Sequence, residues 1–314
     1  MRKDIILVKH CYDINWSKEL NEMFSEIFYD PFKFTEKTYL PGRSQQANYE
    51  ALIIKKMRAE KIDKVFFVNY IDDFSNNFIK GGFAKEIYGL AHSSNNQIGD
   101  VKTDDRLKFY EDGIVKMATK LFTNSKHLSK YIKAETIPLG LPVKNTFEKP
   151  NINSDKILFN QRLAKEKGFR YLYDIKEEYR DRFIISSPKG NLSCIPKLKK
   201  LYKNFHFKIP NSKYKFLIKD CGFVVSFADL ENFGTSIHES IAKGLCPLVI
   251  KNDNTCHSEM IIPELIFNDL DHLYELIDDL TINKEKRKKL ILKQQDKSKI
   301  YKKDNYINNL LKHL

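Results

Sequence analysis

The sequence has few of the residues that break or cross-link a chain. Its 314 residues include only 12 glycines, 10 prolines and five cysteines. The cysteines form no Cys-x-x-Cys pair and no zinc-binding spacing, and their number is odd, so neither a disulfide scaffold nor a zinc module is indicated. No low-complexity stretch and no repeat of solenoid period is present.

Long hydrophobic runs are missing as well. No apolar run reaches the roughly 18–20 residues that span a bilayer. Residues 1–10 (MRKDIILVKH) read as a first strand, and their apolar run is too short for the core of a secretory signal. Reduced thiols and a cytoplasmic location are therefore the default expectation; this would be the host cytoplasm if a phage encodes the chain.

What is present fits ordinary globular domains. The length suits two domains of about 150 residues each. Hydrophobic residues make up 42% of the chain and charged residues 30%. The 54 Lys and Arg exceed the 41 Asp and Glu by 13 charges, which suits a nucleotide-sugar, a nucleic acid or an anionic membrane surface as partner. A Lys-rich surface with no such partner explains the same excess.

Short apolar runs alternate with amphipathic segments in both halves. In the first half, strands are predicted at 4–8, 64–68, 118–122 and 136–143, and helices at 16–28, 49–61 and 126–133, while 71–110 looks polar and irregular. In the second half, strands are predicted at 156–160, 183–186, 205–209, 223–227 and 246–250, and helices at 167–178, 195–202, 212–219, 235–243, 270–280 and most of 284–311. This alternation predicts parallel sheets with helices on both faces.

A polar, proline-containing stretch at 144–155 separates the two halves. We expect a Rossmann-like domain at residues 1–145, a second at 146–290, and a C-terminal helix at 291–314 that packs back on the first domain. Because α/β sheets bind ligands at the carboxyl ends of their strands, two such domains are expected to face a common cleft.

The most informative segment follows the predicted strand 223–227. A loop contains Glu231, and a helix begins near Thr235, directly after Gly234. Unpaired N–H groups and the dipole at a helix N-terminus favour an anion. Glu239 lies about one turn into the helix, and two carboxylates can grip different hydroxyls of one polyol. A loop acid and a solvated helix acid are the ordinary alternative.

This segment resembles the GT-B glycosyltransferases of the large retaining family whose mark is two glutamates with seven residues between. Here the mark is ENFGTSIHE, from Glu231 to Glu239, and SIAKGLCPLV then looks like the family's small-residue helix, Gly turn and final strand. Upstream, NQRLAKEKGF at 160–169 resembles the family's Arg followed five residues later by a Lys-Gly pair. The resemblance covers the C-terminal half well and the N-terminal half only in outline.

The resemblance implies an α/β protein of the GT-B fold, with an N-terminal acceptor domain and a C-terminal donor domain. It implies retaining, metal-independent transfer of a hexose from a nucleotide-sugar, UDP-glucose by family frequency, with no other cofactor. Arg162 and Lys167 would hold the donor diphosphate, unless they are plain surface charges. Glu239 would hold the ribose and Glu231 the transferred sugar. The donor-binding set is completed by Asn232, Phe233, Gly234 and Thr235.

Two fixed cations and a helix N-terminus can stabilise a departing diphosphate without a metal. The sequence has no Asp-x-Asp pair suited to a metal; Asp72-Asp73 and Asp104-Asp105 are adjacent acids that read as solvated loops. The nucleotide base is expected near residues 186–191 and 207–211.

The N-terminal half offers His92, in the polar stretch AHSSNN, as the histidine that the family often places beside the donor sugar. His10 is a rival, and a turn histidine without a catalytic role is the alternative. KHCYDINW stands where a Gly-rich loop commonly follows the first strand. Asp100 and the pair at 104–105 could face the acceptor, but no general base can be assigned.

Three interpretations of the partner remain. The preferred acceptor is a hydroxymethylated base in DNA, as in phage DNA glucosyltransferases of GT-B architecture, because basic and aromatic residues interleave at 29–43 and 102–116. A cell-surface glycan or lipid-linked intermediate at the inner membrane face is the second, with peripheral membrane contact. A non-catalytic binding module is the third. The sequence indicates no oligomeric state.

Overall fold

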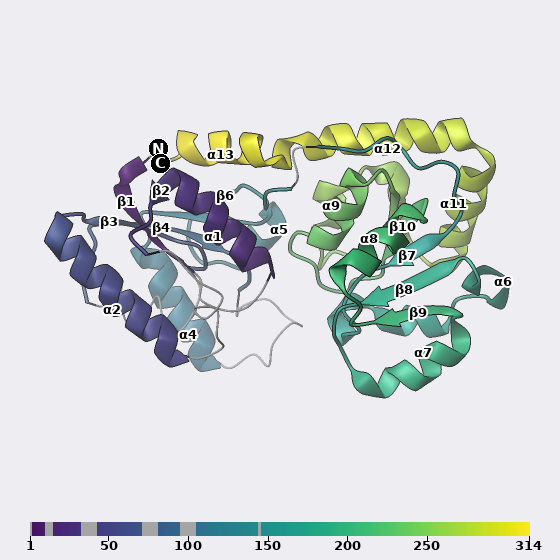
Figure 1. The fold of residues 1–314 in the computed structure, drawn as a ribbon, viewed down its shortest axis with the longest axis horizontal. Coiled ribbons are helices and arrows are strands. Elements are labelled where there is room, and N and C mark those ends of the chain that lie inside the picture. The colour runs from purple at the N-terminus through teal and green to yellow at the C-terminus, as the bar shows by residue number, and fades with distance from the viewer. Residues whose placement is uncertain (1, 10–14, 33–42, 71–80, 95–104, 144–145) are drawn as a thin grey trace. The chain divides into compact units, whose positions relative to one another are not determined.

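The computed structural model describes residues 2–9, 15–32, 43–70, 81–94, 105–143 and 146–314. The chain divides into two compact units, Met1–Pro138 and Leu139–Leu314, each described by itself below (Figure 1). The expected boundaries at 145 and 290, and the packing of residues 291–314 on the first domain, stay predictions.

The first unit is built on a six-stranded parallel sheet of order β2-β1-β3-β4-β5-β6. Its strands are β1 Arg2–Val8, β2 Phe28–Tyr29, β3 Lys64–Phe67, β4 Glu86–Ala91, β5 Lys120–Thr123 and β6 Thr136–Pro138. Its helices are α1 Asn15–Ile27, α2 Arg43–Glu60, α4 Asp105–Ile114 and α5 Lys126–Ser129, with a 3-10 turn, η2 Val115–Met117. The apolar runs at 4–8 and 64–68 are buried strands of this sheet, as the sequence predicts.

The stretch 71–110 was expected to be irregular, and this expectation is wrong for β4 and α4. β4 carries Gly89 in its interior, which weakens the strand signal in the sequence. The structure explains that glycine: a Cβ at Gly89 would lie 2.6 Å from the side chain of Tyr70. The strand therefore needs a glycine so that the Tyr70 ring can pack against the sheet.

The second unit is a six-stranded parallel sheet of order β12-β11-β10-β7-β8-β9. Its strands are β7 Ile157–Phe159, β8 Phe183–Ser187, β9 Asn204–Phe207, β10 Phe223–Ser226, β11 Cys246–Ile250 and β12 Ile266–Phe267. Its α-helices are α6 Glu177–Arg180, α7 Ile195–Leu201, α8 Asn211–Lys219, α9 Thr235–Ala242, α10 His257–Met260, α11 Leu270–Ile282, α12 Lys284–Ser298 and α13 Lys303–Lys312. The 3-10 turns are η3 Lys165–Lys167, η4 Phe169–Tyr173, η5 Leu192–Cys194, η6 Pro263–Leu265 and η7 Lys299–Tyr301.

Helices cover both faces of this second sheet. Figure 1 shows α7 on the opposite side of the sheet from α8 and α9. The central strands β7, β10 and β11 are consequently buried over their whole length. Burial on both faces explains why these strands read as continuous apolar runs in the sequence.

The helix predicted at 167–178 is replaced by two 3-10 turns and the short helix α6. Gly168 interrupts it with a left-handed backbone, φ 65°. Among the described residues, no helix is long and apolar enough to cross a bilayer.

Candidate functional site

The strand order of the second sheet marks one point where a ligand site is expected. The chain runs outward from β7 through β8 to β9, returns to β10 beside β7, and then runs outward in the other direction to β12. Parallel sheets bind ligands at the carboxyl edge where the order reverses, here between β7 and β10. The loops that leave these two strands carry both sequence motifs.

The turn after β7 is seated directly on the end of β10. At Gly168, whose φ is 65°, an added Cβ would lie 1.8 Å from the carbonyl oxygen of Phe227. Any side chain would therefore push the turn away from the strand. This close approach is the physical reason for the Lys-Gly pair, since the glycine places Lys167 at the neighbouring loop.

Backbone hydrogen bonds then fasten the two loops together. The carbonyl oxygen of Glu166 accepts from the N–H groups of Asp229 and Leu230, at 2.9 and 3.0 Å. Lys167 Nζ lies 2.9 Å from Glu231 Oε2 and 3.1 Å from the Leu230 carbonyl oxygen. The structure thus brings together one cation and one acid from the two motifs, 64 positions apart in the chain.

The Lys167–Glu231 pair is largely withdrawn from solvent, with side chains 15% and 13% exposed. Burial by itself raises the pKa of the Glu231 carboxyl. The Lys167 ammonium and a hydrogen bond from the Gly234 N–H outweigh burial and hold that pKa below its ordinary value. Glu231 is therefore a carboxylate at neutral pH.

The helix start next to Glu231 has the expected form. Gly234 adopts a left-handed backbone (φ 74°) and α9 begins at Thr235. The first intrahelical bonds run from the N–H groups of Ile237 and His238 to the Gly234 carbonyl, so the amides of the first turn point out of the helix end. Phe233 is buried and stacks on His238, with ring centroids 4.5 Å apart, which holds the loop against α9.

Arg162 and Glu239 do not join this ion pair directly. Arg162 Nη2 pairs with Glu166 Oε1 at 2.9 Å, within the same turn. Glu239 is exposed on α9, and its charge raises the pKa of the Tyr214 hydroxyl, after the larger effect of burial. The Tyr214 hydroxyl accepts a hydrogen bond from Asn160 Nδ2 at 2.8 Å, at the end of β7. The side chains of Arg162 and Glu239 thus lie around the same carboxyl edge of the second sheet.

The loops expected near the nucleotide base adjoin the turn that carries Arg162. Leu163 donates its N–H to the Lys189 carbonyl and accepts from the Asn191 N–H, at 3.0 and 2.8 Å. Lys208 N–H donates to the Ser187 carbonyl at 2.9 Å. The ends of β7, β8 and β9 are therefore linked into one surface; that a base binds there stays a prediction.

In the first unit, His92 directly follows β4. Its Nε2 lies 2.8 Å from the Val68 carbonyl oxygen, and a carbonyl only accepts, so Nε2 carries the proton. Its own carbonyl accepts from Asn124 Nδ2 at 3.4 Å. These contacts place His92 at the carboxyl edge of the first sheet; its role beside a donor sugar stays a prediction. His10, Asp100 and Asp104 lie outside the described residues, as do Asp72 and Asp73.

Three features of this edge were not predicted. Arg170 forms a two-pronged ion pair with Asp229, with one N–O distance of 2.8 Å, and so clamps the two loops beside Lys167. Gln161 Nε2 donates to Ser226 Oγ at 2.9 Å, which ties the end of β7 to the end of β10. The buried oxygens Asn160 Oδ1 and Gln161 Oε1 have no hydrogen-bond partner among the described residues. The partners of Arg170 and of Gln161 Nε2 lie 59 and 65 positions away in the chain, so spacing along the sequence carries no signal for these contacts.

No group of His, Cys, Asp or Glu side chains suited to a metal ion is found among the described residues. Metal independence stays a prediction.

No protein-family model and no curated protein matches the sequence. Solved structures do match the fold. A sucrose-phosphate synthase from Thermosynechococcus elongatus aligns with a TM-score of 0.73 at 12% identity, covering 99% of both chains. Anabaena HepE in complex with UDP aligns with 0.73 at 11% identity, covering all of both chains. The lipopolysaccharide outer core galactosyltransferase WaaB aligns with 0.65 at 12% identity, again over both full chains. At these identities the likeness establishes the fold, which is GT-B, and confirms the predicted fold class.

Proposed function

We propose that this chain is a glycosyltransferase that moves a hexose from a nucleoside diphosphate sugar to an acceptor hydroxyl. The observation that carries the proposal is the Lys167–Glu231 pair, which lies between β7 and β10 beside the start of α9. Cations that face phosphate, a carboxylate that faces hydroxyls and a helix start are what such a donor requires. HepE, which has the same fold, has been solved with UDP and with UDP-glucose.

Lys167 has capacity left for a phosphate although it is already paired. Its ammonium has three N–H bonds, of which one goes to Glu231 and one to the Leu230 carbonyl. The third can donate to a diphosphate oxygen. Arg162, 39% exposed at the edge of the same turn, can swing from Glu166 to the diphosphate and add a second cation. Both charges oppose the negative charge that develops on the leaving group.

Transfer would proceed with retention of configuration. The bond from sugar C1 to the diphosphate oxygen breaks, the bond from C1 to the acceptor oxygen forms on the same face, and the acceptor proton passes to the departing diphosphate. In this scheme Glu231 and the backbone at Asn232 to Thr235 hold the sugar hydroxyls, Glu239 the ribose, and His92 lies beside the reacting carbon. No metal and no protein base is required.

Two acceptor classes have support of different kinds. The +13 charge supports a hydroxymethylated base in DNA, the acceptor that the sequence favours. The similarity to WaaB, which is named a lipopolysaccharide outer core galactosyltransferase, supports a surface glycan instead. DNA binding through phosphates weakens steeply with added salt, whereas an association with lipid appears as co-sedimentation with vesicles. If the protein does not bind DNA even at low salt, DNA is excluded as the acceptor.

The donor is tested by thermal shift with UDP, UDP-glucose, UDP-galactose and UDP-N-acetylglucosamine, followed by donor hydrolysis. A ligand that binds only the folded state stabilises it by about 2.7 kcal/mol at one hundred times its Kd. We expect Glu239→Ala to weaken UDP binding and Arg162→Ala to lower turnover, while Lys203→Ala, in an exposed ion pair with Asp181, changes neither. A protein that neither binds nor hydrolyses any of these nucleotide-sugars would favour the non-catalytic binding module. If both site variants match wild type, the site is misassigned.

A further inference from the structure

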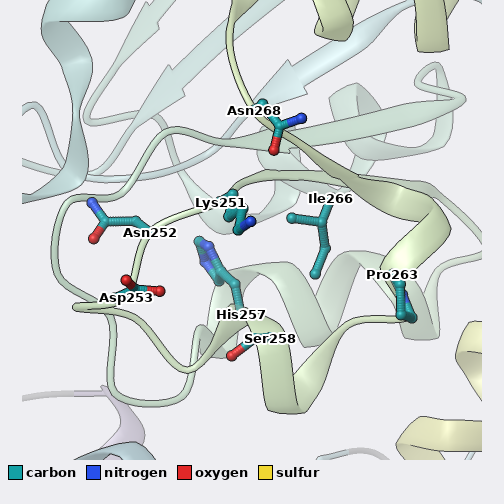
Figure 2. Close-up of a pocket in the computed structure, with 8 residues that line it drawn as sticks. All are labelled: Lys251, Asn252, Asp253, His257, Ser258, Pro263, Ile266 and Asn268. Carbon is teal, nitrogen blue, oxygen red and sulfur yellow. The ribbon is translucent and has the colours of Figure 1, made fainter.

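A pocket opens at the carboxyl ends of β11 and β12 in the second unit, outside the residues assigned above (Figure 2). Its volume is about 270 Å³. This lies just below the roughly 300–1,000 Å³ of sites for drug-sized ligands, so it suits a ligand the size of one sugar ring. The lining residues that matter here are Lys251, Asp253, His257, Pro263, Ile266 and Asn268.

His257 forms a fixed wall of this pocket. Its Nδ1 lies 3.1 Å from the Ile250 carbonyl oxygen, so Nδ1 carries the proton. Its Nε2 then accepts from Ser226 Oγ, 3.4 Å away, and Ser226 Oγ in turn accepts from Gln161 Nε2. Because both ring nitrogens are engaged inside the protein, the imidazole offers the pocket a flat face.

The two charged groups of the pocket are free to bind a ligand. The side chains of Lys251 and Asp253 are exposed, and neither makes a hydrogen bond or an ion pair with any residue that the structure describes. In the view of Figure 2, the Lys251 side chain lies between the His257 ring and Asn268. One unpaired cation and one unpaired acid therefore face the same space.

This combination favours a neutral polyol over a ligand that carries charge of one sign. A phosphate would be attracted by Lys251 and repelled by Asp253, and an amine would meet the reverse. A hydroxyl group both accepts and donates, so neighbouring hydroxyls can accept from Lys251 and donate to Asp253 at the same time. The His257 face and the side chains of Pro263 and Ile266 give the C–H face of a sugar ring an apolar surface.

We propose that this pocket binds a single hexose ring of a carbohydrate. The segment that lines it is also fastened to the loop of Glu231: Cys256 N–H donates to the Glu231 carbonyl at 2.8 Å, and Thr255 pairs with Glu231. The pocket thus adjoins the proposed donor site without sharing its side chains. The proposal concerns binding alone and goes beyond the transfer reaction, because it holds whether or not the chain uses a nucleotide-sugar.

Saturation-transfer NMR and calorimetry on the full chain, with glucose, galactose and N-acetylglucosamine as probes, test the proposal. We expect at least one of them to bind, and Lys251→Ala and Asp253→Asn each to weaken it by about tenfold, the value of a lost hydrogen bond to a charged group. The matched controls Lys203→Ala and Asp181→Asn remove the exposed pair on the same unit and should leave the affinity unchanged.

Several outcomes would overturn the proposal. These are no binding of any of the three sugars, equal loss in the control variants, or displacement by inorganic phosphate with the same dependence on Lys251. Sugar binding that is lost in Glu231→Gln and retained in Lys251→Ala would place the ring in the donor site instead. UDP binding on the same samples separates the two proposals: UDP without hexose refutes only the pocket, and hexose without UDP refutes only the donor site.

Discussion

Replacing Gly168 by alanine perturbs the turn that carries Lys167. The alanine would have to adopt φ 65°, which costs an L-residue about 1–2 kcal/mol. Its Cβ would also lie 1.8 Å from the Phe227 carbonyl oxygen, a backbone atom at the end of β10 that cannot rotate aside. Relieving such a clash typically costs about 1–3 kcal/mol more. The expected loss in the free energy of unfolding is therefore about 2–5 kcal/mol.

Gly234→Ala is the matched control in the same unit. Gly234 has a similar φ of 74°, but the nearest heavy atom to its added Cβ is Glu231 Cγ at 3.5 Å, an ordinary contact. Only the backbone term of about 1–2 kcal/mol remains. Urea unfolding followed by circular dichroism measures both losses, and calorimetry measures UDP affinity. A loss in Gly168→Ala no larger than in Gly234→Ala would refute the close approach, and with it our reason for the Lys-Gly pair.

Three further predictions address other parts of the second unit. Arg170→Gln should change the free energy of unfolding by less than about 1 kcal/mol, because the Arg170–Asp229 ion pair is half exposed. The same variant should weaken UDP binding, because the loop that carries Asp229 is no longer held. The charge swap Arg170→Asp with Asp229→Arg should restore the UDP affinity. His238 is buried without a hydrogen-bond partner among the described residues, and burial lowers its pKa to about 3. Below about pH 6.5 the His238 imidazole takes up a proton in the unfolded chain but not in the folded one. The free energy of unfolding therefore decreases as the pH is lowered, by about 2 kcal/mol at pH 5. His238→Phe should remove that part of the fall between pH 7.5 and 5, and identical slopes of urea midpoint against pH would contradict this. Arg287 is buried over the Phe223 ring and donates hydrogen bonds to the carbonyls of Ser154 and Ile152. Arg287→Met should therefore lower the free energy of unfolding by about 2–4 kcal/mol, whereas Lys286→Met, at the exposed neighbour, should lower it by less than about 0.5 kcal/mol. Equal losses in the two variants would refute the role of the buried guanidinium.

Local patterns in the sequence were sufficient for most of the second sheet. The runs at 183–186, 223–227 and 246–250 are apolar because each strand is covered on both faces, so composition alone marks them. The same logic failed at β4, where Gly89 accommodates the ring of Tyr70. It failed again at 167–178, where contact with Phe227 requires a left-handed glycine in a segment of helical periodicity.

For the candidate site, too, some features follow from the sequence and others only from the tertiary structure. The sequence by itself determined the fold class and which residues belong to the two motifs, because strand periodicity, helix starts and motif spacing are local properties. Only the tertiary structure decided that Lys167 meets Glu231, that Arg170 meets Asp229, and that Lys251 and Asp253 face one pocket. Each of these contacts joins side chains whose distance depends on the strand order and on the seating of one loop upon another, and spacing along the chain does not encode that distance.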